Sequence, residues 1–197
     1  MRNVFYLSLL TLLLPANNLI SNKVNVIAND VTYDIHPIVH EINYGDDFVT
    51  LPNKIELSID NEISNRYIAE EAYEVIGLKP ILMNTGDDFS DFELIIETYN
   101  GTDEHFDKLD AYTVDINSSH IKIVGQSERA CFYGLQTLRE IFSQSNNQIR
   151  ELSIKDYANS LYRGVIEGLY GTTWNHFEIM DMIDLIADYK GNSFFYG

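Results

Sequence analysis

The C-terminal part of the sequence limits most strongly what this chain can fold into. An apolar, β-branched strand is predicted over 161–166, followed by a loop over 167–174. A helix is predicted over 175–190, and a second strand over 192–196. Two strands joined by a helical crossover pair in parallel, so this order predicts one βα unit and the next strand of a parallel α/β domain. The faces of such a unit need neighbours, and we expect the unit to begin a domain that the chain, ending at Gly197, does not complete.

The predicted helix over 175–190 has clear end signals. Asn175 can cap its first turn, and Glu178 three residues later completes a capping box. Lys190 suits the negative C-terminal end of the helix dipole, and Gly191 is predicted to take the left-handed conformation that ends it. The apolar face is formed by residues at helical spacing: Ile179, Met180, Ile183, Ile186 and Ala187.

Residues 31–155 show a different pattern, in which short strands are interrupted by two helices. The helices are predicted over 64–76 and 127–142, each with one apolar stripe. The segment at 31–44 is predicted to be extended, and strands are predicted at 49–51, 54–59, 81–83, 92–98, 112–116, 121–124 and 149–154. The strands at 112–116 and 121–124 are expected to form an antiparallel hairpin across the turn at 117–119. This arrangement predicts an α+β domain, a set of strands with two helices packed on one side, ahead of the unit at 160–197.

Length and charge narrow the function classes. The chain has 197 residues, of which 45% are hydrophobic, enough for one full domain and part of a second. It carries 30 acidic and 13 basic residues, a formal net charge of -17. Long-range repulsion therefore argues against nucleic acid and anionic lipid surfaces as partners. The acidity favours solubility and neutral or cationic partners.

The sequence predicts no metal site and no cofactor. Cys131 is the single cysteine, so no intramolecular disulfide or cysteine-based zinc cluster can form. Its apolar neighbours predict a buried small hydrophobe and not a nucleophile. The five histidines are scattered, and Pro37 argues against a helix that would bring His36 and His40 together as ligands.

Residues 1–28 have the organisation of a signal peptide. Arg2 gives a short basic start, and 4–14 are almost wholly apolar, a length too short to span a bilayer. Small residues near Ala28 predict cleavage there, with no stable membrane insertion afterwards. We expect a bacterial protein that is secreted or displayed at the cell surface; a retained membrane anchor is the alternative.

Three stretches together resemble a known enzyme family. Arg163–Trp174 (RGVIEGLYGTTW) resembles the first strand and loop of the catalytic barrel of glycoside hydrolase family 84, and Lys190–Tyr196 (KGNSFFY) resembles its second barrel strand. This family comprises retaining β-N-acetylglucosaminidases, including hyaluronidase-like enzymes and O-GlcNAc hydrolases. Ser127–Leu138 (SERACFYGLQTL) resembles a helix of the domain that precedes the barrel in families 84 and 20. The resemblance implies an accessory domain at 31–155 and the start of an incomplete (β/α)8 barrel at 160–197.

The match to the family pattern is not complete. Leu169 stands where family 84 usually has phenylalanine, and Thr173 where it usually has proline. Family 20 usually ends its first barrel strand with an Asp-x-x-Arg-His type sequence, whereas this chain has Glu-Gly-Leu-Tyr-Gly at 167–171. The resemblance therefore favours family 84.

One substrate-binding residue is carried over from the resemblance. In the family, the glycine at Gly168 contacts the sugar through its backbone, which fits the close approach that a residue without a side chain permits. The alternative is that Gly168 and Gly171 only allow a tight bend. Tyr170 and Trp174 are expected to pack under the barrel rim, with a place in the site wall as the alternative, and Glu167 is assigned no catalytic role.

The resemblance implies a glycosidase acting on N-acetylglucosamine-containing glycans or glycoproteins. Its catalytic pair of adjacent aspartates belongs to the fourth barrel strand, so no catalytic residue is assigned among these 197, and they are expected to be inactive alone. The implied mechanism is substrate-assisted and retaining, and needs no metal or cofactor. Two alternatives stay open: a free-standing glycan-binding or adhesion module, and a relic without function.

Overall fold

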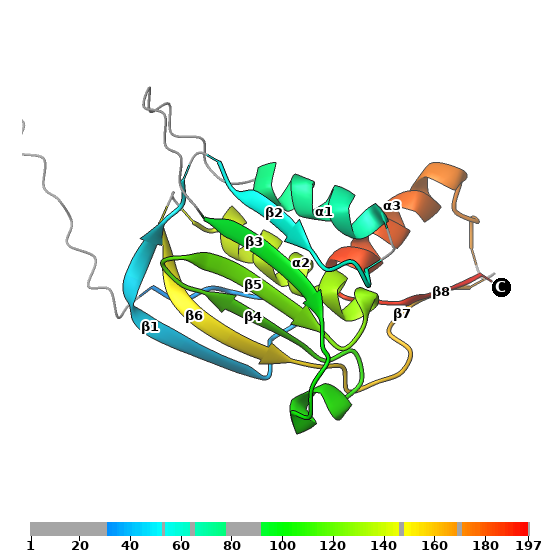
Figure 1. Ribbon diagram of the computed structural model, residues 1–197. Helices are drawn as coiled ribbons and strands as arrows, with labels where there is room; N and C mark the ends of the chain where they lie inside the picture. Colours follow the sequence, from blue (N-terminus) through cyan, green and yellow to red (C-terminus); the bar gives the residue numbers. More distant parts are fainter. Residues whose placement is uncertain are drawn as a thin grey trace, which may run out of the picture.

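A computed structural model describes residues 31–52, 54–63, 66–77, 92–145, 148–168 and 171–196. The predicted signal peptide at 1–28 and the predicted strand at 81–83 lie outside these residues. The described chain forms a six-stranded sheet covered by two helices, followed by a separate two-stranded sheet with its own helix (Figure 1).

The six-stranded sheet is mixed. Its order is β1-β6-β4-β5-β3-β2, in which β2–β3 and β3–β5 are parallel pairs and the other neighbours are antiparallel. The predicted hairpin is confirmed, because β4 and β5 pair antiparallel across the turn at 117–119. The strands are β1 (Glu41–Thr50), β2 (Glu56–Ile59), β3 (Glu93–Thr98), β4 (Tyr112–Ile116), β5 (His120–Gly125) and β6 (Gln148–Asp156).

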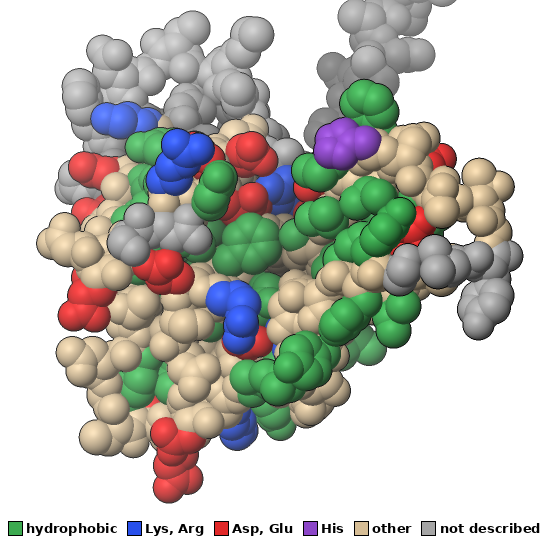
Figure 2. Space-filling model, turned by 90° about the vertical axis from the view of Figure 1, so that its right-hand side faces the viewer, with side chains coloured by type: hydrophobic (Ala, Val, Ile, Leu, Met, Phe, Trp, Pro, Cys, Tyr) green, Lys and Arg blue, Asp and Glu red, His purple; other side chains and the backbone are tan. Residues whose placement is uncertain are grey.

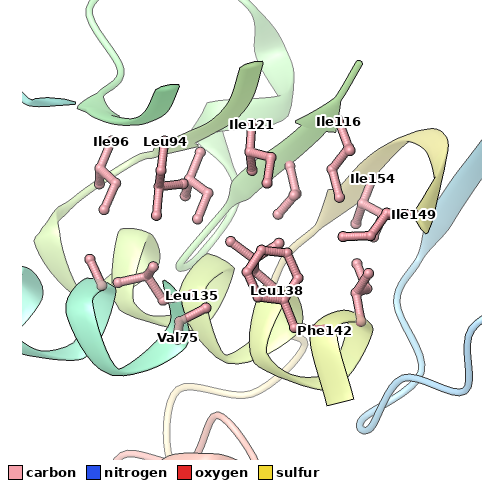
Figure 3. Close-up of a cluster of buried hydrophobic side chains, with 14 of the residues drawn as sticks. Val75, Leu94, Ile96, Ile116, Ile121, Leu135, Leu138, Phe142, Ile149 and Ile154 are labelled. Carbon is pink, nitrogen blue, oxygen red and sulfur yellow. The ribbon is translucent and has the colours of Figure 1, made fainter. Parts of the chain in front are cut away.

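Helices α1 (Arg66–Gly77) and α2 (Glu128–Ser143) cover one face of this sheet, as predicted (Figure 1). Ser127 caps α2, because its side chain accepts a hydrogen bond from the backbone N–H of Ala130 at 3.3 Å. Figure 3 shows strand side chains pointing at the two helices, and each of the labelled residues is buried. The labelled side chains are Leu94, Ile96, Ile116, Ile121, Ile149 and Ile154 from the sheet, and Val75, Leu135, Leu138 and Phe142 from the helices.

The strand boundaries differ from the sequence prediction at the edge of the sheet. β1 is ten residues long, whereas the sequence predicts only 49–51 as strand and 31–44 as extended chain. Its register against β6 shifts between Tyr44 and Phe48, so an irregularity interrupts the alternation that a regular strand would show. Between β3 and β4, a short 3-10 helix, η2 (Glu104–Asp107), begins after its cap residue Asp103.

The second sheet confirms the predicted parallel pair. β7 (Gly164–Glu167) and β8 (Ser193–Tyr196) are parallel and are joined by α3 (His176–Asp188). The sequence predicts the strand from residue 161, but it starts at Gly164 because the side chain of Asn192 holds the preceding segment. Its amide donates to Leu161 O at 2.8 Å and accepts from Arg163 N at 2.9 Å.

The predicted left-handed end of α3 is shifted by one residue. No described glycine has a positive φ, whereas Lys190 has φ 58, so the prediction for Gly191 is wrong. Gly191 is required for space instead, because an added Cβ would lie 2.4 Å from Cγ2 of Ile186. The left-handed conformation costs a lysine some free energy, and here it lets the Lys190 side chain reach the buried carboxylate of Asp156.

α3 lies on the side of α1 and α2 that faces away from the six-stranded sheet. Figure 2 shows hydrophobic side chains gathered on the face that carries the β7–α3–β8 unit. α3 has no buried residue. Large exposed hydrophobic side chains of the unit, two of them from the predicted apolar face of α3, include Ile166, Phe177, Met180, Ile183, Leu185, Phe195 and Tyr196. Within the described residues, none of the helices has the length and apolar character needed to cross a membrane.

Candidate functional site

The predicted substrate-binding residue, Gly168, follows directly after β7. It is exposed, and it stands at the carboxyl end of a parallel strand pair, where Glu167 is in register with Tyr196 of β8. Parallel α/β folds place their ligand sites at this end of the strands. The structure therefore places Gly168, exposed, directly after the carboxyl end of β7.

Glu167 holds the loop that starts at Gly168. Its side chain is buried, with 7% of the residue exposed, and Oε1 accepts a hydrogen bond of 2.8 Å from the backbone N–H of Trp174. Oε2 is buried and has no hydrogen-bond partner among the described residues. The carboxylate thus holds the far end of the loop in place.

The residues after the loop are fixed by packing and capping. The ring of Trp174 stacks on Phe194 of β8, with centroids 6.3 Å apart and an interplanar angle of 26°. This contact agrees with the packing role expected for Trp174, while Tyr170 lies outside the described residues. The capping box is present as predicted: Asn175 Oδ1 accepts from Glu178 N at 3.1 Å, and Glu178 Oε2 accepts from Asn175 N at 2.7 Å.

The glycines of the motif differ in what they are needed for. At Gly164, an added Cβ would lie 1.6 Å from the carbonyl oxygen of Ser193, so no other residue fits between β7 and β8. At Gly171, an added Cβ would meet nothing within 4 Å. The fold therefore requires Gly164, the first glycine of the motif, which sequence reasoning missed. The signal available in the sequence was an isolated glycine inside a strand pattern.

A second cluster of functional groups joins the two sheets at the opposite end of β7. Asp110, 2% exposed, stands before β4 and binds two arginines. Its Oδ1 accepts from Arg129 Nε at 2.9 Å and Nη2 at 2.6 Å, and its Oδ2 accepts from Arg163 Nη2 at 2.8 Å. The hydrogen bond to Asp110 raises the pKa of Arg129.

Asp156 forms the other buried carboxylate of this junction. It accepts 2.7 Å hydrogen bonds from the hydroxyl of Tyr112 and from Nδ1 of His40. Nζ of Lys190 lies 3.7 Å from Oδ2, an ion pair that is longer than a hydrogen bond. Burial lowers the pKa of Lys190 despite the attraction of Asp156, and burial together with the charge of Asp156 raises the pKa of Tyr112.

These groups border a cavity of about 270 Å³ between the two sheets. Arg163 closes one side, since its Nε donates to Lys190 O at 3.0 Å and its Nη1 donates to Ser160 O at 2.7 Å. Five residues form this junction: Asp110, Tyr112, Asp156, Arg163 and Lys190. Among their polar side-chain atoms, only Nζ of Lys190 is buried without a hydrogen bond in the described structure. Because the other polar groups satisfy one another, the junction fixes the β7–α3–β8 unit against the first domain.

Sequence reasoning missed this junction, because its members are far apart along the chain. Arg163 and Lys190 stand out in the sequence for other reasons, as part of a motif and as a helix end. Two non-glycine residues with positive φ, Asp110 at 51° and Lys190 at 58°, mark the places where the backbone bends to bring them in. Neither conformation has a sequence signal that distinguishes it from an ordinary turn.

The described residues offer no group of three or more histidine, cysteine, aspartate or glutamate side chains that could hold a metal ion. Cys131 is fully buried, as predicted, and burial raises the pKa of its thiol to about 12. His40 is occupied by Asp156 and by the amide of Asn159 at 3.2 Å, and His105 bonds the carbonyl of Tyr112 at 3.0 Å. These side chains serve the packing of the first domain.

Two family models match the chain. The model of glycosyl hydrolase family 20, domain 2, matches residues 32–157, and the model described as beta-N-acetylglucosaminidase matches residues 163–197. The Beta-hexosaminidase of Vibrio vulnificus is 32% identical over 87 residues, which make up 44% of this chain and 10% of that protein.

Solved structures are also similar to this chain. The structure of CpGH84D has 28% sequence identity and a TM-score of 0.75, and the match covers 84% of this chain and 30% of that one. The GH20 exo beta-N-Acetylglucosaminidase from Vibrio harveyi, solved in complex with N-acetylglucosamine, is 20% identical with a TM-score of 0.60, over 82% of this chain and 25% of its own, and shares the fold. The chain thus spans less than a third of the length of each of these relatives.

Proposed function

We propose that this chain is the N-terminal part of a β-N-acetylglucosaminidase, because it belongs to the domain family described as glycosyl hydrolase family 20, domain 2. Its relatives are glycoside hydrolases of the hexosaminidase type. The proposed substrates are glycans or glycoproteins that end in N-acetylglucosamine. The domain that precedes the barrel resembles that of both families 84 and 20, and between these two families of enzyme we favour family 84. This choice is supported by the likeness to CpGH84D and by the Glu-Gly-Leu-Tyr-Gly sequence at 167–171.

The observation that carries the proposal is the parallel pairing of β7 with β8 through α3. This unit lies within the stretch that matches the beta-N-acetylglucosaminidase model. Its exposed apolar side chains are those expected of a first βα unit that packs against further units (Figure 2). We therefore infer that 160–197 begin a catalytic (β/α)8 barrel, which takes about 250 residues in full.

Gly168 is proposed to contact the sugar through its backbone. Three features support this role: its exposure, its position at the carboxyl end of β7, and the lack of a side chain that would hold a ligand away. Glu167 supports the contact indirectly, because its bond to Trp174 N closes the loop that Gly168 opens. No catalytic residue is assigned in this chain.

The proposed reaction is substrate-assisted and retaining. The 2-acetamido group of the substrate attacks its own anomeric carbon while one aspartate orients it, and a second aspartate acts first as acid and then as base. The pair Asp46–Asp47 lies on β1 of the first sheet, and 87–88 lie outside the described residues. The catalytic pair would therefore come from sequence after Gly197, and the 197 residues alone are expected to have no turnover.

Export is part of the proposal. The basic start and the apolar run at 4–14 support a signal peptide at 1–28, and with it a secreted or surface-displayed bacterial protein. Peptide sequencing of the N-terminus of the protein in the medium checks this directly. Cleavage near Ala28 supports export, whereas an intact Met1 in the cytoplasm contradicts it.

The test of the activity begins at the gene. Reading past the Gly197 codon should reveal the Pro-Lys-Asp-Asp segment that follows the second barrel strand in family 84 and, later in the same frame, an adjacent aspartate pair. The full product should then hydrolyse a fluorogenic N-acetylglucosaminide, while residues 1–197 should not. A stop codon at this point with no such segment in any frame would overturn the enzyme proposal, and glycan binding by the 197-residue chain would then favour a binding module.

Two glycine variants of the full product separate the sugar contact from a mere bend. Gly168→Ala should lower kcat/KM by about tenfold or more, since one lost contact of about 1.4 kcal/mol has that effect. Gly171→Ala is the matched control, because an added Cβ there meets open space. Equal activity of the two variants would remove Gly168 from the site.

A further inference from the structure

A cleft of about 510 Å³ lies between α1, α2 and α3, away from Gly168. α3 returns antiparallel to the strands that it connects, so its last turns lie at the opposite end of the unit from the carboxyl end of β7. The cleft is thus separate from the proposed sugar site, and a ligand bound in it would not depend on the proposed function.

The cleft carries a strong excess of negative charge. Its walls include five carboxylates from two helices: Glu70, Glu71 and Glu74 from α1, and Asp184 and Asp188 from α3. Arg139 is the cation that lines it; its guanidinium hydrogen-bonds Glu71 and lies 3.4 Å from Glu74. Asp184 and Asp188 form no ion pair within the part of the chain that the structure describes. Arg66 is not part of the lining, but its Nε lies 3.8 Å from Oε1 of Glu70 in an exposed ion pair. Two cations against five carboxylates still leave an excess of negative charge, which attracts a positively charged ligand.

An independent feature of the cleft indicates a missing donor. Gln136, only 2% exposed, lines the cleft from α2, and its Nε2 donates to Glu71 Oε1 at 2.9 Å. This contact fixes the orientation of the amide, because the reverse would place its oxygen against a carboxylate. Its Oε1 is then a buried acceptor with no hydrogen-bond partner among the described residues. Buried acceptors are normally satisfied, so a hydrogen-bond donor is expected here.

The carboxylates also act on one another. Burial raises the pKa of Asp188, and the charges of Glu71 and Asp184 add to this effect while Arg139 opposes it. A bound cation would relieve this repulsion. The described carboxylates do not gather into a group of three that could hold a metal ion, which favours an extended organic cation over a compact one.

We propose that this cleft binds a linear aliphatic polyamine, a cation with ammonium groups three or four methylene groups apart. Glu70 and Glu74 are one helical turn apart on α1, as are Asp184 and Asp188 on α3. Side chains at this spacing are about 5–6 Å apart, which matches neighbouring ammonium groups of such a chain. The N–H groups supply the donor that Gln136 lacks, and Phe132 gives the methylene groups an apolar wall.

The test is titration calorimetry of spermidine into the 197-residue chain. Binding should be one to one, and the double variant Asp184→Asn/Asp188→Asn should weaken it by at least about tenfold, the loss expected for roughly 1.4 kcal/mol. The matched control is Asp46→Asn/Asp47→Asn, which removes the same charge from an exposed part of β1. It should change the affinity by less than about twofold.

Equal weakening by the two double variants would overturn the proposal, since the attraction would then be to net charge alone. Absence of binding to the unaltered chain would overturn it as well, because the cleft would then take no polyamine. Two further arms sharpen the result. Gln136→Met keeps the side-chain volume but removes both the Oε1 acceptor and the Nε2 donor to Glu71, and it should weaken binding several-fold with the circular dichroism spectrum unchanged. Magnesium chloride should displace spermidine no more than sodium chloride of equal ionic strength; stronger displacement would indicate a metal site and contradict the polyamine.

Discussion

The Asp110 carboxylate and the Arg163 guanidinium form a buried ion pair, with Oδ2 and Nη2 2.8 Å apart, that ties the first sheet to the residue preceding β7. Asp110 is 2% exposed, whereas the side chain of Arg163 is 22% exposed and that of Arg129, the other arginine on the same carboxylate, is 51% exposed. The pair with Arg163 is thus the better shielded from water.

Asp110→Asn should therefore be strongly destabilising. Removing one partner of a buried pair costs about 3–5 kcal/mol, because the other charge stays behind without compensation. Arg129→Met should cost less than about 1 kcal/mol, since that arginine is half exposed and screened. Urea unfolding of the chain and of both variants measures the difference, and similar losses for the two would contradict the ranking.

Gly164→Ala should loosen the β7–α3–β8 unit while sparing the first domain. The new Cβ would lie 1.6 Å from the carbonyl oxygen of Ser193, so the two strands must separate. Hydrogen exchange should rise at 193–196 and stay unchanged in β4 and β5. Gly171→Ala serves as control and should change stability by less than about 0.5 kcal/mol.

Cys131 should be inert in the folded protein. Burial raises the pKa of its thiol from 9.0 to about 12, so the thiolate that attacks disulfide reagents is almost absent at pH 8. Reaction with a chromogenic disulfide should be slow in buffer and fast in denaturant. Rapid labelling without denaturant would mean that α2 opens readily.

The same pKa shift predicts how stability depends on alkaline pH. The thiol has a higher pKa in the folded chain than in the unfolded chain. Its contribution to the free energy of unfolding is therefore fully present below pH 9 and is lost as the pH rises towards about 12. Cys131→Ala removes this titration, at the cost of a smaller side chain in the core. The slope of unfolding free energy between pH 9 and 11 should be shallower in the variant than in the unaltered chain.

Asn175→Ala should destabilise the first turn of α3. The side chain of Asn175 satisfies the backbone N–H groups of Phe177 and Glu178, and loss of such a cap costs about 0.5–2 kcal/mol. Amide exchange at 177–180 should increase first. Asn175→Ser, which can still accept these bonds, should restore most of the protection; failure to do so would count against the capping role.

Local patterns in the sequence are sufficient for most elements. The stripe of α2, the hairpin of β4 and β5 and the capping box at Asn175 each depend on residues close together along the chain, and all are confirmed. The α+β class and the parallel pairing of β7 with β8 follow from the order of the elements, because a helical crossover leaves strands parallel.

The sequence by itself thus determined most of the elements and their class, together with the placing of Gly168 at a strand end, but neither the length of β1 nor the 3-10 helix η2. Only the tertiary structure decided the strand order of the mixed sheet, the space that requires Gly164, and the left-handed conformation of Lys190 in place of Gly191. It also decided the meeting of Asp110 with Arg163, 53 residues away. The physical reason is range: periodicity and capping act within a few residues, whereas ion pairs and close packing depend on which distant segments the folded core brings together.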